Sequence, residues 1–169
     1  MIHDTRKSAR SPALHGPDGD TGAARHLRCL RVEGVSLEDA RAITAQHRRQ
    51  LAADQVLVID YELDPRVVLG DAFDRDVGEA ALRAGRHGST LTLLGAGLAP
   101  LMDLCDLEAP LPLERILERA SVLAPGEALA ARTPCFPRPL FSLLDRRALD
   151  WEAVEDVDES AIVWVGRPG

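Results

Sequence analysis

QVLVIDYELDPRVVL, residues 55–69, joins a strongly apolar stretch to a helix start. The segment Gln55–Glu62 is apolar enough to form a buried strand. Asp64 then offers a side-chain acceptor for a helix N-cap, and Pro65 suits the first helical position. The stretch therefore predicts a strand that is followed closely by a helix, the unit from which layered α/β structures are built.

The same alternation continues on both sides of this stretch. Upstream, His26–Glu33 predicts a strand, and Ser36 begins a helix as an N-cap. Downstream, Ser89–Leu94 predicts a further strand. The segment Glu79–Ala84 is assigned to a short strand, because it follows a glycine and matches a strand in the second half of the chain.

The second half repeats this order at a constant offset of 72 residues, without a gap. Pro65-Arg66 falls on Pro137-Arg138, and Thr90–Leu93 falls on Ile162–Val165. The coincidence indicates a tandem duplication. The elements predicted here are strands at Leu101–Leu107, Glu127–Arg132, Trp151–Val154 and Ala161–Val165, and helices at Pro112–Val122 and Pro137–Arg147.

We therefore expect an α+β protein built from two tandem βαβαββ two-layer sandwiches, each with two helices on one face of a mixed four-stranded sheet. Residues 26–97 form the first repeat and residues 98–169 the second. Residues 1–25 lack apolar periodicity and are expected to form a flexible leader. Because each repeat is small for an independent core, we expect the two to pack on each other or to dimerise, burying Trp151 and Trp164.

The composition argues against several classes of function. The 169 residues include 20 Lys and Arg against 27 Asp and Glu, a net charge of −7, so nucleic acid is not expected as a partner. No stretch reaches the roughly 18 apolar residues of a transmembrane helix, so no membrane partner is expected either. Three cysteines, an odd number, suit a reducing compartment, and we expect a cytoplasmic protein.

One segment carries a family resemblance. Asp103–Arg119, DLCDLEAPLPLERILER, followed by Leu123–Leu129, LAPGEAL, resembles the TusA/SirA-like superfamily. Within it the likeness is greatest to an uncharacterised branch known as a domain of unknown function. The resemblance covers Leu101–Gly166 and reaches the first repeat only through the duplication and Asp64-Pro65. It implies the same βαβαββ sandwich.

The resemblance also implies a chemistry that this chain lacks at the expected position. TusA-type carriers hold a persulfide on the cysteine of a Cys-Pro-x-Pro motif at a helix start. Here the motif reads Ala109-Pro110-Leu111-Pro112, and alanine cannot carry sulfur. We therefore expect a non-catalytic binding or adaptor protein, whose partner is another protein or a small acidic metabolite.

The expected binding site lies where two helices begin, next to strands that end at the same edge of the sheet. Free N–H groups and guanidinium groups at such an edge can hold an anion. On this interpretation, Arg138→Ala weakens binding more than Arg66→Ala. The candidate site residues are Ala109, Pro110, Pro112, Arg132, Cys135 and Arg138.

The alternative is a sulfur-transfer or thiol-redox protein that uses a relocated thiol at Cys135, which also lies close to a helix start. Cys29 and Cys105 fall in predicted strands, where a small buried hydrophobic role is expected. The five histidines show no metal-ligand spacing, so no metal or cofactor is expected.

Overall fold

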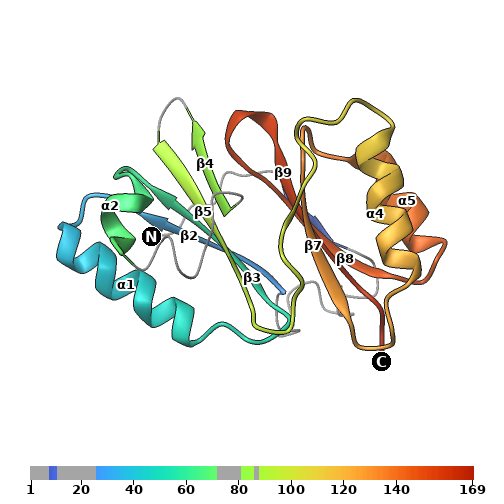
Figure 1. The fold of residues 1–169 in the computed structure, drawn as a ribbon, viewed down its shortest axis with the longest axis horizontal. Coiled ribbons are helices and arrows are strands. Elements are labelled where there is room, and N and C mark those ends of the chain that lie inside the picture. Colours follow the sequence, from blue (N-terminus) through green and yellow to red (C-terminus); the bar gives the residue numbers. More distant parts are fainter. Residues whose placement is uncertain (1–7, 11–25, 72–80, 86–87) are drawn as a thin grey trace.

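The computed structural model describes residues 8–10, 26–71, 81–85 and 88–169 of the chain. Two sheets face each other, and helices cover the outer face of each sheet (Figure 1). The layers therefore follow the order helix, sheet, sheet, helix. Each half of the chain is a two-layer α+β unit with a mixed sheet.

The first half forms one four-stranded sheet. Its elements are β2 (Leu27–Val32), α1 (Leu37–Arg49), β3 (Val56–Tyr61), α2 (Pro65–Leu69), β4 (Leu82–Gly85) and β5 (Gly88–Leu94). The strand order is β2-β3-β5-β4. β2 and β3 are parallel, whereas β5 is antiparallel to both of its neighbours.

The second half forms the other sheet. Its elements are β6 (Met102–Asp103), α4 (Leu111–Ser121), β7 (Ala128–Thr133), α5 (Arg138–Asp145), β8 (Asp150–Glu155), the 3₁₀ turn η3 (Val157–Glu159) and β9 (Ala161–Gly166). The strand order β8-β9-β7-β6 reproduces that of the first half, and β1 (Ser8–Arg10) adds a fifth strand against β8. Among the helices described, none combines the length and the apolar character needed to cross a membrane.

Two helix starts in the first half have the caps that the sequence predicts. The Ser36 hydroxyl accepts a hydrogen bond from the Asp39 N–H at 3.1 Å. The Asp64 carboxylate accepts one from the Arg66 N–H at 2.9 Å, with Pro65 as the first helical residue. These side chains satisfy N–H groups that have no partner within the helix, which explains why both helices begin there.

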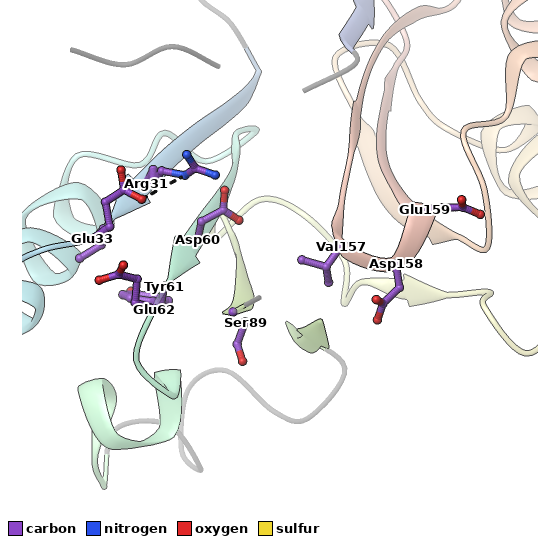
Figure 2. A pocket seen from close by; sticks show the side chains of 11 residues that line it. Arg31, Glu33, Asp60, Tyr61, Glu62, Ser89, Val157, Asp158 and Glu159 are labelled. Atoms are coloured by element: carbon purple, nitrogen blue, oxygen red, sulfur yellow. Dashed lines mark ion pairs between the residues drawn. The ribbon is translucent and has the colours of Figure 1, made fainter. Parts of the chain in front are cut away.

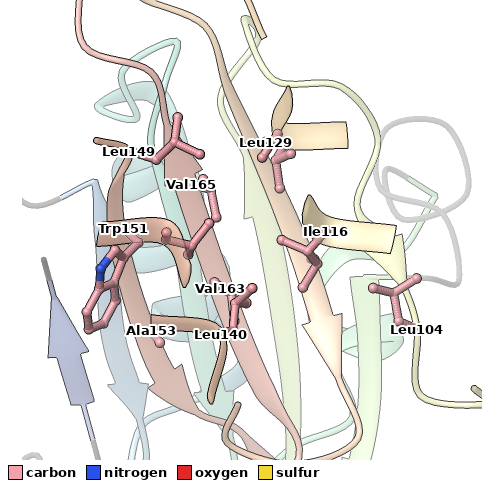
Figure 3. Close-up of a cluster of buried hydrophobic side chains, with 12 residues drawn as sticks. Leu104, Ile116, Leu129, Leu140, Leu149, Trp151, Ala153, Val163 and Val165 are labelled. Carbon is pink, nitrogen blue, oxygen red and sulfur yellow. The ribbon is translucent and has the colours of Figure 1, made fainter. Parts of the chain in front are cut away.

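Each sheet packs its outer face against its own helices. Beneath α1 and α2, the buried core includes Leu57, Ile59 and Leu91. In the second half, Ile116 of α4 and Leu140 of α5 fill the corresponding space (Figure 3). Alternation along each strand sends every second side chain to this face.

The inner faces of the two sheets form a separate core. Its buried members are Leu27, Val56, Val58, Ala130, Val154, Ile162 and Trp164. The ring of Trp164 stacks on His26 with centroids 4.0 Å apart, and its Nε1 donates to the Asp54 carbonyl at 2.8 Å. The expectation that Trp164 is buried between the halves is confirmed.

The structure corrects the expectation for Trp151. Its ring stacks on Phe141 of α5, with centroids 4.0 Å apart, and its Nε1 donates to Asp145 at 2.8 Å. Trp151 therefore packs beneath a helix of its own half and not between the halves. The reason is strand alternation, because residue 151 and residue 164 project from opposite faces of the sheet.

Three further expectations about boundaries need revision. The predicted strand Leu101–Leu107 is confined to β6, because the Asp103 carboxylate accepts from the Cys105 N–H at 3.1 Å and the chain turns there. The predicted strand Glu79–Ala84 is observed as β4, and residues 79–80 lie outside the described residues. In the leader, residues 8–10 form β1, and the rest of residues 1–25 lies outside the described part.

Candidate functional site

The expected site residues at the two helix starts of the second half are mostly exposed. Ala109 and Pro110 are exposed ahead of α4, whereas Pro112 is buried against the core. Cys135 is exposed ahead of α5, and Arg138 is exposed as the first residue of α5. Both starts follow the neighbouring parallel strands β6 and β7, so they share one edge of the sheet as predicted. None of these residues lines either cavity described below.

Arg132 does not belong to this group. Arg132 is wholly buried on the inner face of β7, whereas its neighbour Ala131 faces the helices. The guanidinium Nη2 donates to the Thr92 hydroxyl of the first half at 3.3 Å. Because successive side chains of a strand point to opposite faces, Arg132 cannot act beside Arg138 on a shared ligand. The grouping of these two arginines in the sequence analysis is wrong.

Arg132 instead forms the centre of a buried charge cluster between the sheets. Its Nη1 lies 3.6 Å from the Asp103 carboxylate, and its Nε lies 3.4 Å from the Asp156 carboxylate. The side chain of Asp156 has no exposed surface, and that of Asp103 is 35% exposed. A buried guanidinium of this kind requires paired carboxylates, because an isolated buried charge is very costly.

A cleft of about 730 Å³ opens between the first half and the η3 turn (Figure 2). We call it the acidic cleft. Its lining residues are Arg31, Val32, Glu33, Asp60, Tyr61, Glu62, Gly88, Ser89, Val157, Asp158 and Glu159. Its volume falls within the range of about 300–1,000 Å³ that is typical of ligand sites.

The charge of the acidic cleft is strongly asymmetric. Five carboxylates line it against one guanidinium, that of Arg31, whose Nε lies 3.7 Å from the Glu33 carboxylate. Glu33, Asp60 and Glu62 belong to the first half, and Asp158 and Glu159 belong to η3 on the other side of the cleft, where the Glu159 side chain points away from the first half (Figure 2). Carboxylates on two facing walls attract a cationic group and repel an anion.

The turn that forms one wall has an unusual backbone. Asp158 has φ 56° and ψ 37°, and Glu159 has φ 65°. Two successive non-glycine residues in the left-handed region cost free energy, and such residues gather at functional sites. The Asp156 carboxylate stabilises the turn by accepting from the Val157 N–H at 2.8 Å.

Cys105 lies near the junction of the halves and is poorly suited to nucleophilic chemistry. Burial raises the pKa of its thiol to about 11, and the Asp103 carboxylate adds to the rise, whereas the positive charges of Arg83 and Arg132 oppose it. The thiol is therefore protonated at neutral pH. None of the three cysteines, all of which lie within the described residues, forms a disulfide bond.

No group of three or more His, Cys, Asp or Glu side chains within the described ranges is arranged to hold a metal ion. The carboxylates of the acidic cleft are thus spread along its walls and do not converge on one point.

The acidic cleft was not predicted from the sequence. Its carboxylates come from three separate segments, around residues 33, 60–62 and 158–159. One signal was present, since Glu33 and Glu62 are each the last residue of a predicted strand, and the carboxyl ends of parallel strands meet at one sheet edge. The contribution of η3 depends on how the halves pack and has no local signal.

Comparison with known proteins covers the second half only. Residues 101–167 match a family model described as "Uncharacterized conserved protein (DUF2249)". This part of the chain is therefore similar to an uncharacterised domain family, in line with the branch named in the sequence analysis. No curated protein and no solved structure gives a significant match.

Proposed function

We propose that this protein is a non-catalytic binding protein that takes up a basic segment of a partner protein in the acidic cleft. The observation that carries this proposal is the lining of the cleft, where five carboxylates stand against one guanidinium. A small acidic metabolite would meet net repulsion there.

Apolar surface beside the cleft favours a protein segment over a simple amine. Val35 and Leu63 are 39% and 41% exposed, and both line a small hollow together with Glu33 and Glu62. A ligand that carries both cationic and apolar side chains can use both kinds of surface.

We further propose that the two halves descend from one TusA-like unit by tandem duplication. The common strand order supports this, and the bounds of β3 and β7 lie 72 residues apart at both ends. Alanine at position 109 argues against sulfur transfer at the motif of that family. The second half carries the match to the uncharacterised domain family, and the first half contributes most of the cleft.

The test uses a short fluorescent peptide of lysine, leucine and glycine, with a matched peptide in which glutamate replaces lysine. We expect fluorescence anisotropy to show that the protein binds the lysine peptide but not the glutamate peptide. The affinity should fall as the salt concentration rises, because salt screens the carboxylates. The double variant Asp158→Asn/Glu159→Gln should lose about tenfold in affinity, equivalent to about 1.4 kcal/mol.

The matched control removes two carboxylates outside the cleft, in Asp106→Asn/Glu114→Gln, and should bind like the wild type. Arg138→Ala belongs in the same series, because the helix-start site predicts that it weakens binding. Preference for the glutamate peptide, together with loss of binding in Arg138→Ala, would contradict the proposal and favour the helix-start site.

A further inference from the structure

Arg132 is connected to one wall of the acidic cleft through Asp156. One carboxylate oxygen of Asp156 lies 3.4 Å from the Arg132 Nε, and the other accepts from the Val157 N–H, the first residue of η3. The Asp156 N–H donates to the Ser160 carbonyl at 2.7 Å, and the Ser160 hydroxyl donates to the Val157 carbonyl at 2.7 Å. The turn is therefore closed around the carboxylate that faces Arg132.

The same arginine reaches the opposite half of the molecule. Its Nη2 donates to the hydroxyl of Thr92 in β5, a strand of the first sheet. Next to this contact, Val157 packs closely on β4, since a Cβ placed on Gly85 would lie 2.8 Å from the Val157 Cβ. The position of η3 relative to the first half is thus set by one buried polar contact and one close apolar contact.

From these contacts we infer that Arg132 is a positioning residue for the acidic cleft. It does not line the cleft, yet through Asp156 it holds η3, whose residues line the cleft on the side opposite Glu33 and Glu62. The consequence for ligand affinity rests on the proposed function. The consequence for the position of η3 does not, because the contacts exist without a ligand.

The guanidinium is suited to this role in a way that an ammonium is not. Its N–H groups point in several fixed directions, and here Nη2 donates to Thr92 while Nη1 and Nε form ion pairs with Asp103 and Asp156. Lysine would keep the positive charge but could not contact all three groups in the same geometry. Arg132→Lys therefore separates the positioning role from simple charge compensation.

The experiment measures amide hydrogen exchange and peptide affinity in wild type, Arg132→Lys and Arg132→Met. We expect exchange at Val157 and Ser160 to rise at least about tenfold in both variants, with the amides of β3 and β5 unchanged. The affinity for the lysine peptide should fall about tenfold in Arg132→Lys, although cooperative unfolding is retained.

If the turn amides of Arg132→Lys exchange at the wild-type rate, the inference is overturned. An equal rise in exchange across β3 and β5 would also overturn it, because such a rise marks a general loss of stability. If neither Arg132 variant folds, Asp156→Asn decides the question, because its amide oxygen still caps Val157 while the charge facing Arg132 is lost. Selective exchange at Ser160 then supports the inference, and unchanged exchange overturns it.

The two proposals fail in different ways. If the wild type does not bind the lysine peptide, the proposed function fails, but the exchange data still test the position of η3. If the wild type binds and Arg132→Lys binds equally well with a mobile turn, Arg132 holds η3 but the ligand does not depend on it, so the part of the inference that concerns affinity fails while the proposed function stands.

Discussion

The first and second halves of this chain share one strand order but differ in their helix layers. In the first half the second helix, α2, has five residues, whereas α5 in the second half has eight. Trp151 stacks on Phe141 beneath α5, and no described residue of the first half makes an aromatic pair with another residue of that half. The two halves thus share the order of their strands, while the helices that cover the strands differ in length and in aromatic packing.

The two halves also differ in what they present at their shared edge. The first half supplies three of the five carboxylates of the acidic cleft, and the second half supplies the buried arginine that we infer to hold the opposite wall. A common backbone plan therefore carries different side chains on its inner face. On the proposed function, the first half supplies most of the groups that contact the ligand, and the second half holds the opposite wall of the acidic cleft in place.

Shortening one buried side chain in the second helix of each half should give the largest difference in stability. Leu140 of α5 and Val68 of α2 are 0% and 1% exposed. We expect Leu140→Ala to lower the free energy of unfolding by about 2–5 kcal/mol. Val68→Ala removes less apolar volume and should cost roughly 1–2 kcal/mol. Urea unfolding followed by circular dichroism measures both free energies. Equal losses would contradict the expectation that truncation beneath α5 costs more than truncation beneath α2.

The junction of the halves should be visible in the titration of Cys105. Because burial raises the pKa of this thiol to about 11, its alkylation should accelerate only near that pH in the folded protein. In urea the same thiol should titrate near the ordinary value of about 8.5. The measurement uses iodoacetamide on the Cys29→Ser/Cys135→Ser variant, with circular dichroism to confirm folding at each pH. Coincident profiles with and without urea would show that Cys105 is not desolvated at the junction.

The helix starts of the two halves should respond differently to loss of a cap. The Ser36 hydroxyl caps α1, whereas α4 begins after Pro110 without a side-chain cap. Ser36→Ala should lower the free energy of unfolding by about 1 kcal/mol. The control is Ser142→Ala, which removes an exposed hydroxyl that donates to the Pro139 carbonyl at 3.3 Å and should change stability little. If Ser142→Ala lowers the free energy of unfolding as much as Ser36→Ala does, the effect of Ser36→Ala is not due to the lost cap.

The outer edges of the two sheets offer the smallest expected change in stability. β1 pairs with β8 through Ser8–Val154, Ala9–Ala153 and Arg10–Glu152. Deletion of residues 1–10 exposes this edge, and exposed strand edges tend to pair with other chains. We expect concentration-dependent self-association in sedimentation velocity, whereas deletion of residues 1–7 alone keeps β1 and should leave the protein unchanged. Identical sedimentation of the two truncations would indicate that β1 does not protect the edge.

Local features of the fold could be predicted because their causes are local. The strand around residue 58 follows from its own apolar side chains, and the starts of α1 and α2 follow from Ser36 and Asp64 within two or three residues. The boundary of β6 was missed because a single hydrogen bond from the Cys105 N–H to Asp103 turns the chain. Propensity does not register such a contact.

The acidic cleft differs from the site that the sequence predicts. The sequence placed binding at the helix starts that follow β6 and β7 in the second half, whereas the acidic cleft lies at the carboxyl ends of β2 and β3 in the first half. It did not place the cleft between the halves. Arg132 was assigned to an exposed edge, since a charged residue is rarely buried unless it is paired, and its partners could not be identified.

By itself, the sequence determined the order of strands and helices, the caps of α1 and α2, and the absence of cysteine at the Ala-Pro-Leu-Pro motif. Tertiary structure alone decided that Arg132 is buried and that η3 faces Glu33 and Glu62. The physical reason is distance along the chain. The partners of Arg132 at positions 92, 103 and 156 come from three separate segments, and only the packing of the two sheets brings them together.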